Sequence, residues 1–220
     1  MRQLVVVPVA GGAREPFFMM RSHAIIGSAE ECDLQLGEPG IGYRHAYLQV
    51  LWGHIACVDL CSESGTLWDE ERRPCDWLMP GRKVRIGAHT LELVDDAGED
   101  DDGFATDCNP LDPDPAEFGP LQHVELEVLN ATKEKVIPVT RPITRVGRHT
   151  DCELRLRDKS VSAVHCGFVL TKRKFWIVDL LGKGGTLLNG APLKDRGEPL
   201  EGDELGIGGF RLRVRFGGGK

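Results

Sequence analysis

The chain has 220 residues, of which 41% are hydrophobic and 28% charged, the composition of a soluble globular protein. This length fits two domains of about 100 residues each. No run of about 18 apolar residues occurs, which argues against a membrane-spanning helix. The seven cysteines have no regular spacing, which favours a reducing compartment, the cytoplasm, over a disulfide framework.

The net charge of −7 is divided between two unlike halves. Residues 1–120 carry 9 Lys and Arg against 22 Asp and Glu, a net charge of −13. Residues 121–220 carry 18 against 12, a net charge of +6. The second half is therefore expected to attract anionic ligands, and the first half to repel them.

The chain begins with an apolar stretch, Leu4–Val9, that could be mistaken for a signal peptide. The stretch is too short, Pro8 interrupts it, and no good cleavage site follows. The corresponding stretch of the second half, Val124–Leu129, has the pattern of a strand. We therefore predict a strand at both places.

The first half also contains four potential zinc ligands, His54, Cys57, Cys61 and Cys75. His54 and Cys57 lie three residues apart on a predicted strand, where their side chains would point to opposite faces. Cys57 also aligns with Ile177, an ordinary core residue. We therefore expect no metal site, and nothing in the sequence calls for a cofactor.

Residues 95–120 are predicted to be an acidic, Pro-rich linker. Glu99–Asp102 is a run of four carboxylates, and four prolines follow it before residue 121. Such a segment cannot bury a core and is expected to be extended and mobile. It would join one domain over residues 1–94 to a second over residues 121–217.

The second domain is predicted to consist of short strands separated by Gly, Pro, Asn and Asp. The predicted strands are His123–Leu129, Val136–Val139, Ile143–Val146, Leu154–Leu156, Cys166–Leu170, Phe175–Asp179, Thr186–Leu188, Glu204–Ile207 and Phe210–Phe216. Asn189–Gly190 predicts a tight hairpin turn. Since no stretch has a sustained helical period, both domains are expected to be all-β sandwiches.

The two halves repeat each other at an offset of 120 residues. The same residue recurs 120 positions later at Gly27, Cys32, Leu34, Leu36, His45, Asp59, Gly65 and Thr66. A period this long indicates two whole domains rather than a solenoid. The copies differ where Ser28 and Gly42 of the first correspond to Arg148 and Ser162 of the second.

The second copy contains four motifs in a characteristic order. They are Gly147-Arg148, Ser162-Ala163-Val164-His165, Gly184-Gly185-Thr186-Leu187-Leu188-Asn189-Gly190 and Gly202-Asp203-Glu204-Leu205-Gly206-Ile207-Gly208. Together they resemble the forkhead-associated (FHA) family, and the resemblance covers nearly all of residues 121–217. It implies an eleven-stranded β-sandwich whose loops at one end bind phosphothreonine peptides.

By this resemblance, Arg148 and Ser162 contact the phosphate, and Ala163, Lys183 and Gly184 line the peptide site. A guanidinium suits a phosphate because its planar fork of donors matches strongly accepting oxygens. Ser162 is expected to supply a hydroxyl and a backbone N–H. The supporting residues, expected to shape or brace the loops rather than to catalyse, are Gly147, His165, Gly185, Thr186 and Asn189.

Other roles stay open for the basic residues of this region. Arg148 could instead form a surface ion pair with Asp151 or Glu153. Further basic residues, Arg145, Arg157 and Lys159, could add electrostatic attraction or could simply be solvated surface.

Three positions depart from the family pattern. Gly184 replaces an asparagine that in family members holds the backbone of the bound peptide. Ala163 stands where a polar residue is common, and Lys183 where Thr or Ser is common. These departures imply an intact phosphate anchor with weaker recognition of the peptide backbone.

The first copy is predicted to be a degenerate FHA-like domain. Ser28 and Gly42 replace both phosphate contacts, and Ser64 and Asp69 occupy the two asparagine positions. Such a domain could act as a structural partner, a dimerisation surface or a phosphorylation-independent docking module.

The sequence thus predicts a non-enzymatic, phosphothreonine-dependent adaptor in Ser/Thr kinase signalling, with an upstream kinase that modifies its partner protein. The alternative is a phosphorylation-independent scaffold or oligomerisation module that uses both domains. No nucleophile–base pair or nucleotide-binding loop indicates an enzyme, and no recognition helix or RNA motif indicates a nucleic-acid partner. Phosphorylated Thr106 of the linker could make an intramolecular contact with the basic second domain.

Overall fold

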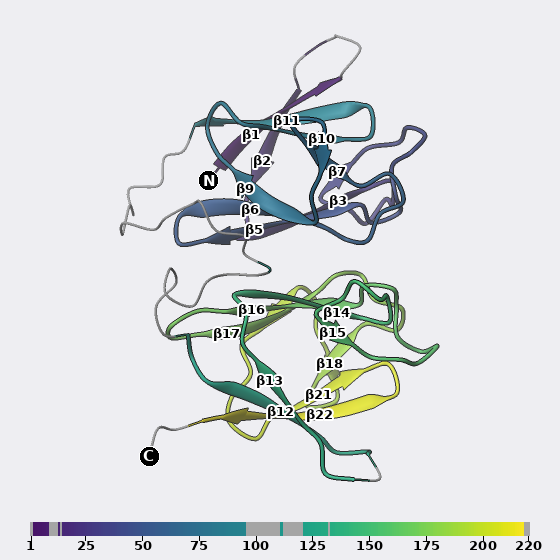
Figure 1. Cartoon of the computed structure of the whole chain (residues 1–220), viewed down its shortest axis with the longest axis vertical. Helices are drawn as coiled ribbons and strands as arrows, with labels where there is room; N and C mark the ends of the chain where they lie inside the picture. The colour runs from purple at the N-terminus through teal and green to yellow at the C-terminus, as the bar shows by residue number, and fades with distance from the viewer. Residues whose placement is uncertain are drawn as a thin grey trace. The chain divides into compact units, whose positions relative to one another are not determined.

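The computed structural model of the chain divides into two compact units, Met1–Asn109 and Pro110–Lys220 (Figure 1). It describes residues 2–8, 13, 15–95, 111, 121–131 and 133–217. The predicted linker, including Thr106, therefore lies outside the described residues except at its first residue and at Leu111. All regular elements of the described residues are strands, so no helix among them could cross a membrane.

The first unit is a sandwich of two sheets. The six-stranded sheet has the order β2-β1-β11-β10-β7-β8, and the five-stranded sheet the order β4-β3-β5-β6-β9. The strands are β1 (Arg2–Pro8), β2 (Glu15–Met19), β3 (His23–Gly27), β4 (Leu34–Gln35), β5 (Ala46–Leu51), β6 (His54–Asp59), β7 (Thr66–Trp68), β8 (Glu71–Arg72), β9 (Cys75–Leu78), β10 (Lys83–Ile86) and β11 (His89–Asp95).

The second unit repeats this topology strand by strand. Its sheets have the orders β13-β12-β22-β21-β18-β19 and β15-β14-β16-β17-β20. The strands are β12 (Val124–Val128), β13 (Val136–Val139), β14 (Ile143–Gly147), β15 (Leu154–Arg155), β16 (Cys166–Leu170), β17 (Phe175–Asp179), β18 (Thr186–Leu188), β19 (Ala191–Pro192), β20 (Arg196–Gly197), β21 (Glu204–Ile207) and β22 (Phe210–Phe216). In each unit one pair is parallel, β3 with β4 and β14 with β15.

Each sandwich encloses its own apolar core. In β12 the buried residues alternate with partly exposed ones, so Val124, Leu126 and Val128 face inward. Opposite them, Phe168 and Phe175 meet edge to face with their ring centroids 5.4 Å apart. Burying one such side chain contributes about 1.5–3 kcal/mol to stability, so these layers hold the loops at the sheet ends.

The all-β expectation is confirmed, and several predicted strands have the observed bounds. The pattern predicted β13, β16, β17, β18, β21 and β22 residue for residue. Asn189 and Gly190 have φ of 51° and 80°, as a two-residue hairpin turn requires. The two-residue strands β19 and β20 were not predicted, because two residues cannot display a period.

Leu111 is the one described residue in the interior of the predicted linker. It is buried, and its carbonyl oxygen accepts a hydrogen bond from Arg141 Nη1 at 2.6 Å. Leu111 is therefore bound to the second unit. The prediction of an extended, mobile linker did not include such a contact.

Candidate functional site

Three loops of the second unit converge on Ser162. In the β14–β15 loop, Arg148 N donates to Ser162 O at 2.9 Å. In the β17–β18 loop, Lys183 N donates to Ser162 Oγ at 2.8 Å. Within its own β15–β16 loop, Ser162 N donates to His165 Nδ1 at 3.2 Å. The sandwich therefore brings together three predicted site residues, Arg148, Ser162 and Lys183, at one end.

These bonds decide what Ser162 can offer a ligand. The sequence predicts a hydroxyl and a backbone N–H, but the N–H is already directed at His165 Nδ1. The hydroxyl accepts from Lys183 N and keeps its own proton to donate. Ser162 thus presents one donor, not two, and its oxygen is held in place by the neighbouring loop.

Arg148 is exposed at the start of the β14–β15 loop. Its guanidinium makes no hydrogen bond or ion pair with any other residue that the structure describes, although its backbone does. The alternative of an ion pair with Glu153 is not observed, because Glu153 binds Arg145 instead. The planar donor fork of Arg148 is therefore available to an anion.

Arg145 does not belong to the basic surface. Its side chain is only 6% exposed, and Nη2 contacts Glu153 Oε1 at 2.8 Å and Asp151 O at 2.7 Å. The expectation that it attracts ligands or is solvated is wrong, since a buried, paired arginine presents little field to solvent. Arg157, Lys159 and Lys183 are exposed, as expected for solvated cations.

His165 braces the loops from below. It is fully buried, with Nδ1 accepting from Ser162 N, so the ring proton lies on Nε2 and is donated to Gly185 O at 3.1 Å. Both ring nitrogens are thereby used in holding two loops together. A histidine engaged in this way is a structural link and has no nitrogen left for acid–base work.

Close backbone contact explains the glycine that precedes Arg148. A Cβ at Gly147 would lie 2.0 Å from Ala163 O, far inside contact distance. The same approach allows Cys152 Sγ to donate to Ala163 O at 3.2 Å. This contact was not predicted, although the recurrence of the cysteine as Cys32 in the first copy was a signal.

Thr186 is held by a residue that the sequence reasoning did not include in the site. Its backbone N and its Oγ1 both donate to Asp179 Oδ1, at 3.0 and 2.7 Å. The last predicted supporting residue, Asn189, lies at the other end of β18 and holds the β18–β19 turn to Asp203 and Glu204. Asn189 therefore supports a different turn from the one around Ser162.

Gly184 lies on the rim of the site with φ of 80°. A Cβ at this position would have no heavy atom within 4 Å. The position is therefore open to solvent, and its backbone conformation is one that glycine adopts without strain and that asparagine tolerates. Nearby, Leu181 has φ of 56°, so the β17–β18 loop contains a strained non-glycine residue as well.

The first unit reproduces the hydrogen bonds that hold these loops together, but not the side chains of Arg148 and Ser162. Ser28 N donates to Gly42 O at 3.0 Å, and Gly42 N donates to His45 Nδ1 at 3.1 Å. His45 Nε2 lies 3.1 Å from Gly65 O. Burial lowers the pKa of His45, which favours the neutral ring that these bonds require.

The corresponding loop of the first unit is closed by its own side chains. Ser62, which replaces Gly182, donates to Asp59 Oδ2 at 2.6 Å and accepts from Gly65 N at 3.0 Å. Arg72 Nη2 donates to Ser62 O at 2.6 Å. The polar groups of this loop are therefore hydrogen-bonded within the first unit. Neither unit has three or more metal-ligating side chains grouped together within the described residues.

The comparisons with known proteins agree with the motifs and the fold. Residues 24–87 and 144–208 each match the profile of the FHA domain, and together they cover more than half of the chain. The chain therefore belongs to the forkhead-associated family, with one such domain in each unit.

Among curated relatives, the glycogen accumulation regulator GarA of Mycolicibacterium smegmatis is 40% identical over 72 residues, which are 33% of this chain and 45% of GarA. The oxoglutarate dehydrogenase inhibitor of Corynebacterium glutamicum is 36% identical over 72 residues, 33% of this chain and 50% of that protein. The chain thus spans about half the length of the curated relatives it matches. A solved structure from an analysis of phosphothreonine-dependent FHA domain interactions aligns with 44% of this chain and 98% of its own, at 24% identity and a TM-score of 0.41.

Proposed function

We propose that the second unit binds a phosphothreonine-containing segment of a partner protein, and that the chain acts as an adaptor in Ser/Thr kinase signalling. The observation that carries this proposal is the exposed guanidinium of Arg148, which has no acceptor among the described residues and starts the loop bonded to Ser162. Membership of the FHA family supports the same assignment. An upstream kinase must supply the phosphothreonine.

The chemistry of the ligand fits this arrangement. A phosphothreonine carries about −1.5 to −2 charges and three strongly accepting oxygens. The Arg148 fork and the Ser162 hydroxyl would donate to those oxygens, and the exposed Lys183 would add positive charge on the neighbouring loop. Because the loops are already bonded to one another, little order has to be created on binding.

Recognition of the peptide backbone is proposed to be weak. Gly184 and Ala163 offer no side-chain donor or acceptor on the rim of the site. The phosphate would therefore provide most of the affinity, and the preference for the surrounding sequence would be broad.

The similar proteins are named for regulation and inhibition, not for a reaction of their own. This supports the proposal that the present chain binds and does not catalyse. It also supports a regulatory setting in which a metabolic enzyme is a candidate partner.

The test is a binding measurement with the full chain and paired peptide libraries, phosphothreonine against unphosphorylated threonine. Arg148→Ala should weaken phosphopeptide binding about 10- to 150-fold, the effect of losing a charged hydrogen-bond donor. Two matched variants should bind normally: Ser28→Ala at the equivalent position of the first unit, and Arg173→Ala on the exposed β16–β17 hairpin. Equal binding of both libraries, or an unaffected Arg148→Ala, would refute the proposal.

A second function is proposed for the first unit, phosphorylation-independent docking or support. Ser28 stands in place of the arginine and Gly42 in place of the serine. Arg72 and Ser62 close the neighbouring loop from within. Partner capture that survives Arg148→Ala but is lost on deleting the first unit would establish this role.

We also propose that the linker regulates the site through Thr106. The tether would give phosphorylated Thr106 a high effective concentration at the basic second unit. Phosphopeptide affinity should therefore fall after the intact chain is phosphorylated, and Thr106→Ala should prevent the fall. No loss of affinity on modification of Thr106 would count against the idea.

A further inference from the structure

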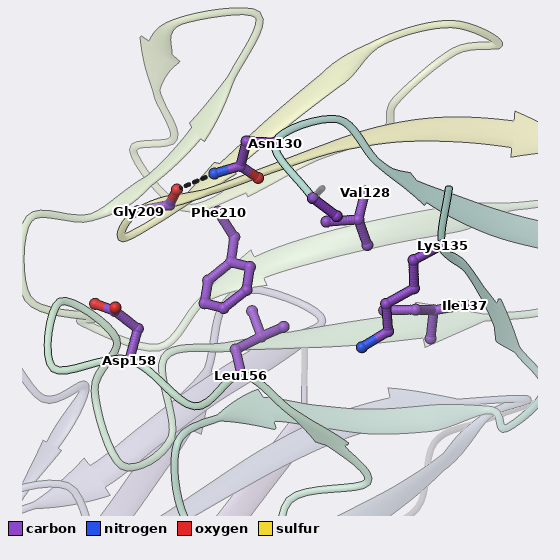
Figure 2. Close-up of a pocket in the computed structure, with 9 residues that line it drawn as sticks. Val128, Asn130, Lys135, Ile137, Leu156, Asp158, Gly209 and Phe210 are labelled. Carbon is purple, nitrogen blue, oxygen red and sulfur yellow. Dashed lines mark hydrogen bonds between the residues drawn. The ribbon is translucent and has the colours of Figure 1, made fainter. Parts of the chain in front are cut away.

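The second unit contains a pocket of about 260 Å³ next to the loop that carries Ser162 (Figure 2). It lies where the β12–β13 turn, the start of the β15–β16 loop and the β21–β22 turn meet. Its walls are the apolar side chains of Val128, Ile137, Leu156 and Phe210. Figure 2 shows Phe210 and Leu156 pointing toward one another from above and below, with Val128 and Ile137 to their right.

Hydrogen bonds hold the edges of the pocket together. Asn130 on the β12–β13 turn donates to Gly209 O at 2.7 Å and accepts from Arg211 N at 3.2 Å. On the other side, Gly209 N donates to Ser160 Oγ at 2.8 Å, and Ser160 Oγ donates to Asp158 Oδ1 at 2.5 Å. The pocket is therefore formed before any ligand arrives, which lowers the entropy cost of binding.

The first unit has a polar contact at the corresponding positions. Phe210 and Asp158 correspond to His89 and Glu38, and His89 Nδ1 lies 2.8 Å from Glu38 Oε2. The second unit keeps the carboxylate but replaces the histidine with a phenyl ring. The apolar wall is thus a property of the unit that also has the phosphate contacts.

The charges at the rim indicate what would fill the pocket. Asp158 is satisfied by Ser160, whose two hydrogen bonds hold the pKa of that carboxyl below its usual value. Lys135, at the opposite end in Figure 2, is exposed and has no acidic partner among the described residues. The unpaired charge at the mouth is therefore the positive charge of Lys135. It favours a ligand that has an anionic group next to the apolar group that enters the pocket.

The volume limits the size of the occupant. Pockets for cofactors and drug-sized ligands have volumes of about 300–1,000 Å³. At about 260 Å³, this pocket suits one or two aliphatic side chains better than a nucleotide or another cofactor.

We infer that this pocket binds an aliphatic side chain of a partner protein, next to a carboxylate that pairs with Lys135, at a second site that needs no phosphate. The second unit then holds its partner at two places on one rigid end. The phosphothreonine contact can be switched by a kinase, whereas the aliphatic contact is permanent. Linking the two contacts raises the overall affinity for a partner that has both.

The experiment is an NMR titration of the isotopically labelled full chain with acetyl-Leu-Glu-amide. Saturable shifts are expected at the backbone amides of Val128, Leu156 and Phe210. Acetyl-Ala-Glu-amide should bind about tenfold more weakly, because less apolar surface is buried. Acetyl-Leu-Gln-amide should bind about two- to fivefold more weakly, because the exposed ion pair is lost. Equal responses to the three probes, no response, or shifts confined to Arg148 and Ser162 would overturn the inference.

Variants separate this site from the phosphate site. Ala131 lines the mouth on an exposed turn, so Ala131→Leu should block the dipeptide, whereas Ala191→Leu on the exposed strand β19 should not. Lys135→Gln should bring acetyl-Leu-Glu-amide down to the affinity of acetyl-Leu-Gln-amide. Arg148→Ala should leave the dipeptide titration unchanged even if it abolishes phosphopeptide binding. Dipeptide shifts that persist in Ala131→Leu would contradict the assignment.

Discussion

The two units share a histidine brace and differ in what lies above it. In both, the backbone N–H of the loop residue three before the histidine donates to Nδ1, and Nε2 reaches a glycine carbonyl in the next loop. Above His165 the second unit places an exposed guanidinium and a serine hydroxyl. Above His45 the first unit places Ser28 and Gly42.

The position of one hydroxyl group accounts for much of this difference. In the second unit Ser162 carries it on the rim, and position 182 is glycine. In the first unit position 42 is glycine, and Ser62 carries the hydroxyl inside the loop, bonded to Asp59 and Gly65. A hydroxyl moved from the rim to the interior stabilises the loop but no longer faces a ligand. Substitutions in both units test this difference.

The largest effect is expected from Gly147→Ala, which attacks the scaffold that both units share. The new Cβ would lie 2.0 Å from Ala163 O, so the loops must separate, at a cost of about 3 kcal/mol. Urea unfolding, followed by the amide NMR signals of the unit that carries the substitution, measures this. Gly37→Ala is the matched control, since a Cβ there has no heavy atom within 4 Å. Similar losses from both changes would show that the close approach is unimportant.

Next in size is Ser62→Gly, which gives the first unit the glycine of the second. Asp59 and Gly65 N lose a buried partner, so the free energy of unfolding of the first unit should fall by about 1–3 kcal/mol. Ser64→Gly removes an exposed serine hydroxyl bonded to Gly40 O and should cost less. If the two substitutions destabilise the unit equally, the buried network is not what closes this loop.

A smaller effect is expected from Gly184→Asn, which restores the family residue at the rim. Asparagine tolerates the positive φ, and its side chain has open space in which to reach a peptide backbone. One neutral hydrogen bond is worth about 1 kcal/mol, so phosphopeptide affinity should rise roughly fivefold. Gly202→Asn, at a turn with φ of 84°, should leave the affinity unchanged. A loss of affinity in Gly184→Asn would mean that the glycine serves the site.

The smallest effect concerns pH and the brace of the first unit. Burial lowers the pKa of His45 in the folded chain, so the unfolded chain takes up a proton first as the pH falls. The stability contributed by neutral His45 is therefore complete above about pH 6.5 and is lost as the pH drops toward the lowered pKa. Unfolding of the first unit at pH 8, 7, 6 and 5 checks this. His45→Gln should show a shallower fall, and an unchanged fall would assign the pH dependence to other groups.

The fold could be read from local patterns because most strands here are long enough to show a period. Cys166–Leu170 and Phe175–Asp179 were predicted to the residue, as was the turn at Asn189. The two-residue strands β19 and β20 escaped prediction, since they exist only through pairing with β18 and β17.

The sequence predicts the residues of the candidate site but not the contacts between them. Arg148 and Ser162 follow from the motifs, and the bonds between their loops agree with that grouping. Two arginines three residues apart, Arg145 and Arg148, look alike in the sequence. Arg145 lies within β14 and is buried against Glu153, whereas Arg148 follows the strand and is exposed in the loop.

The two-domain β architecture, the repeat and the asymmetry between the copies follow from the sequence alone, because periodicity, turn residues and motif spacing are properties of neighbours along the chain. Three facts become visible only in the folded chain: the N–H of Ser162 is bonded to His165, Arg148 has no acidic partner among the described residues, and Phe210 completes an apolar pocket. These facts depend on loops separated by tens of residues in the chain, whose side chains meet only when the two sheets close around their core.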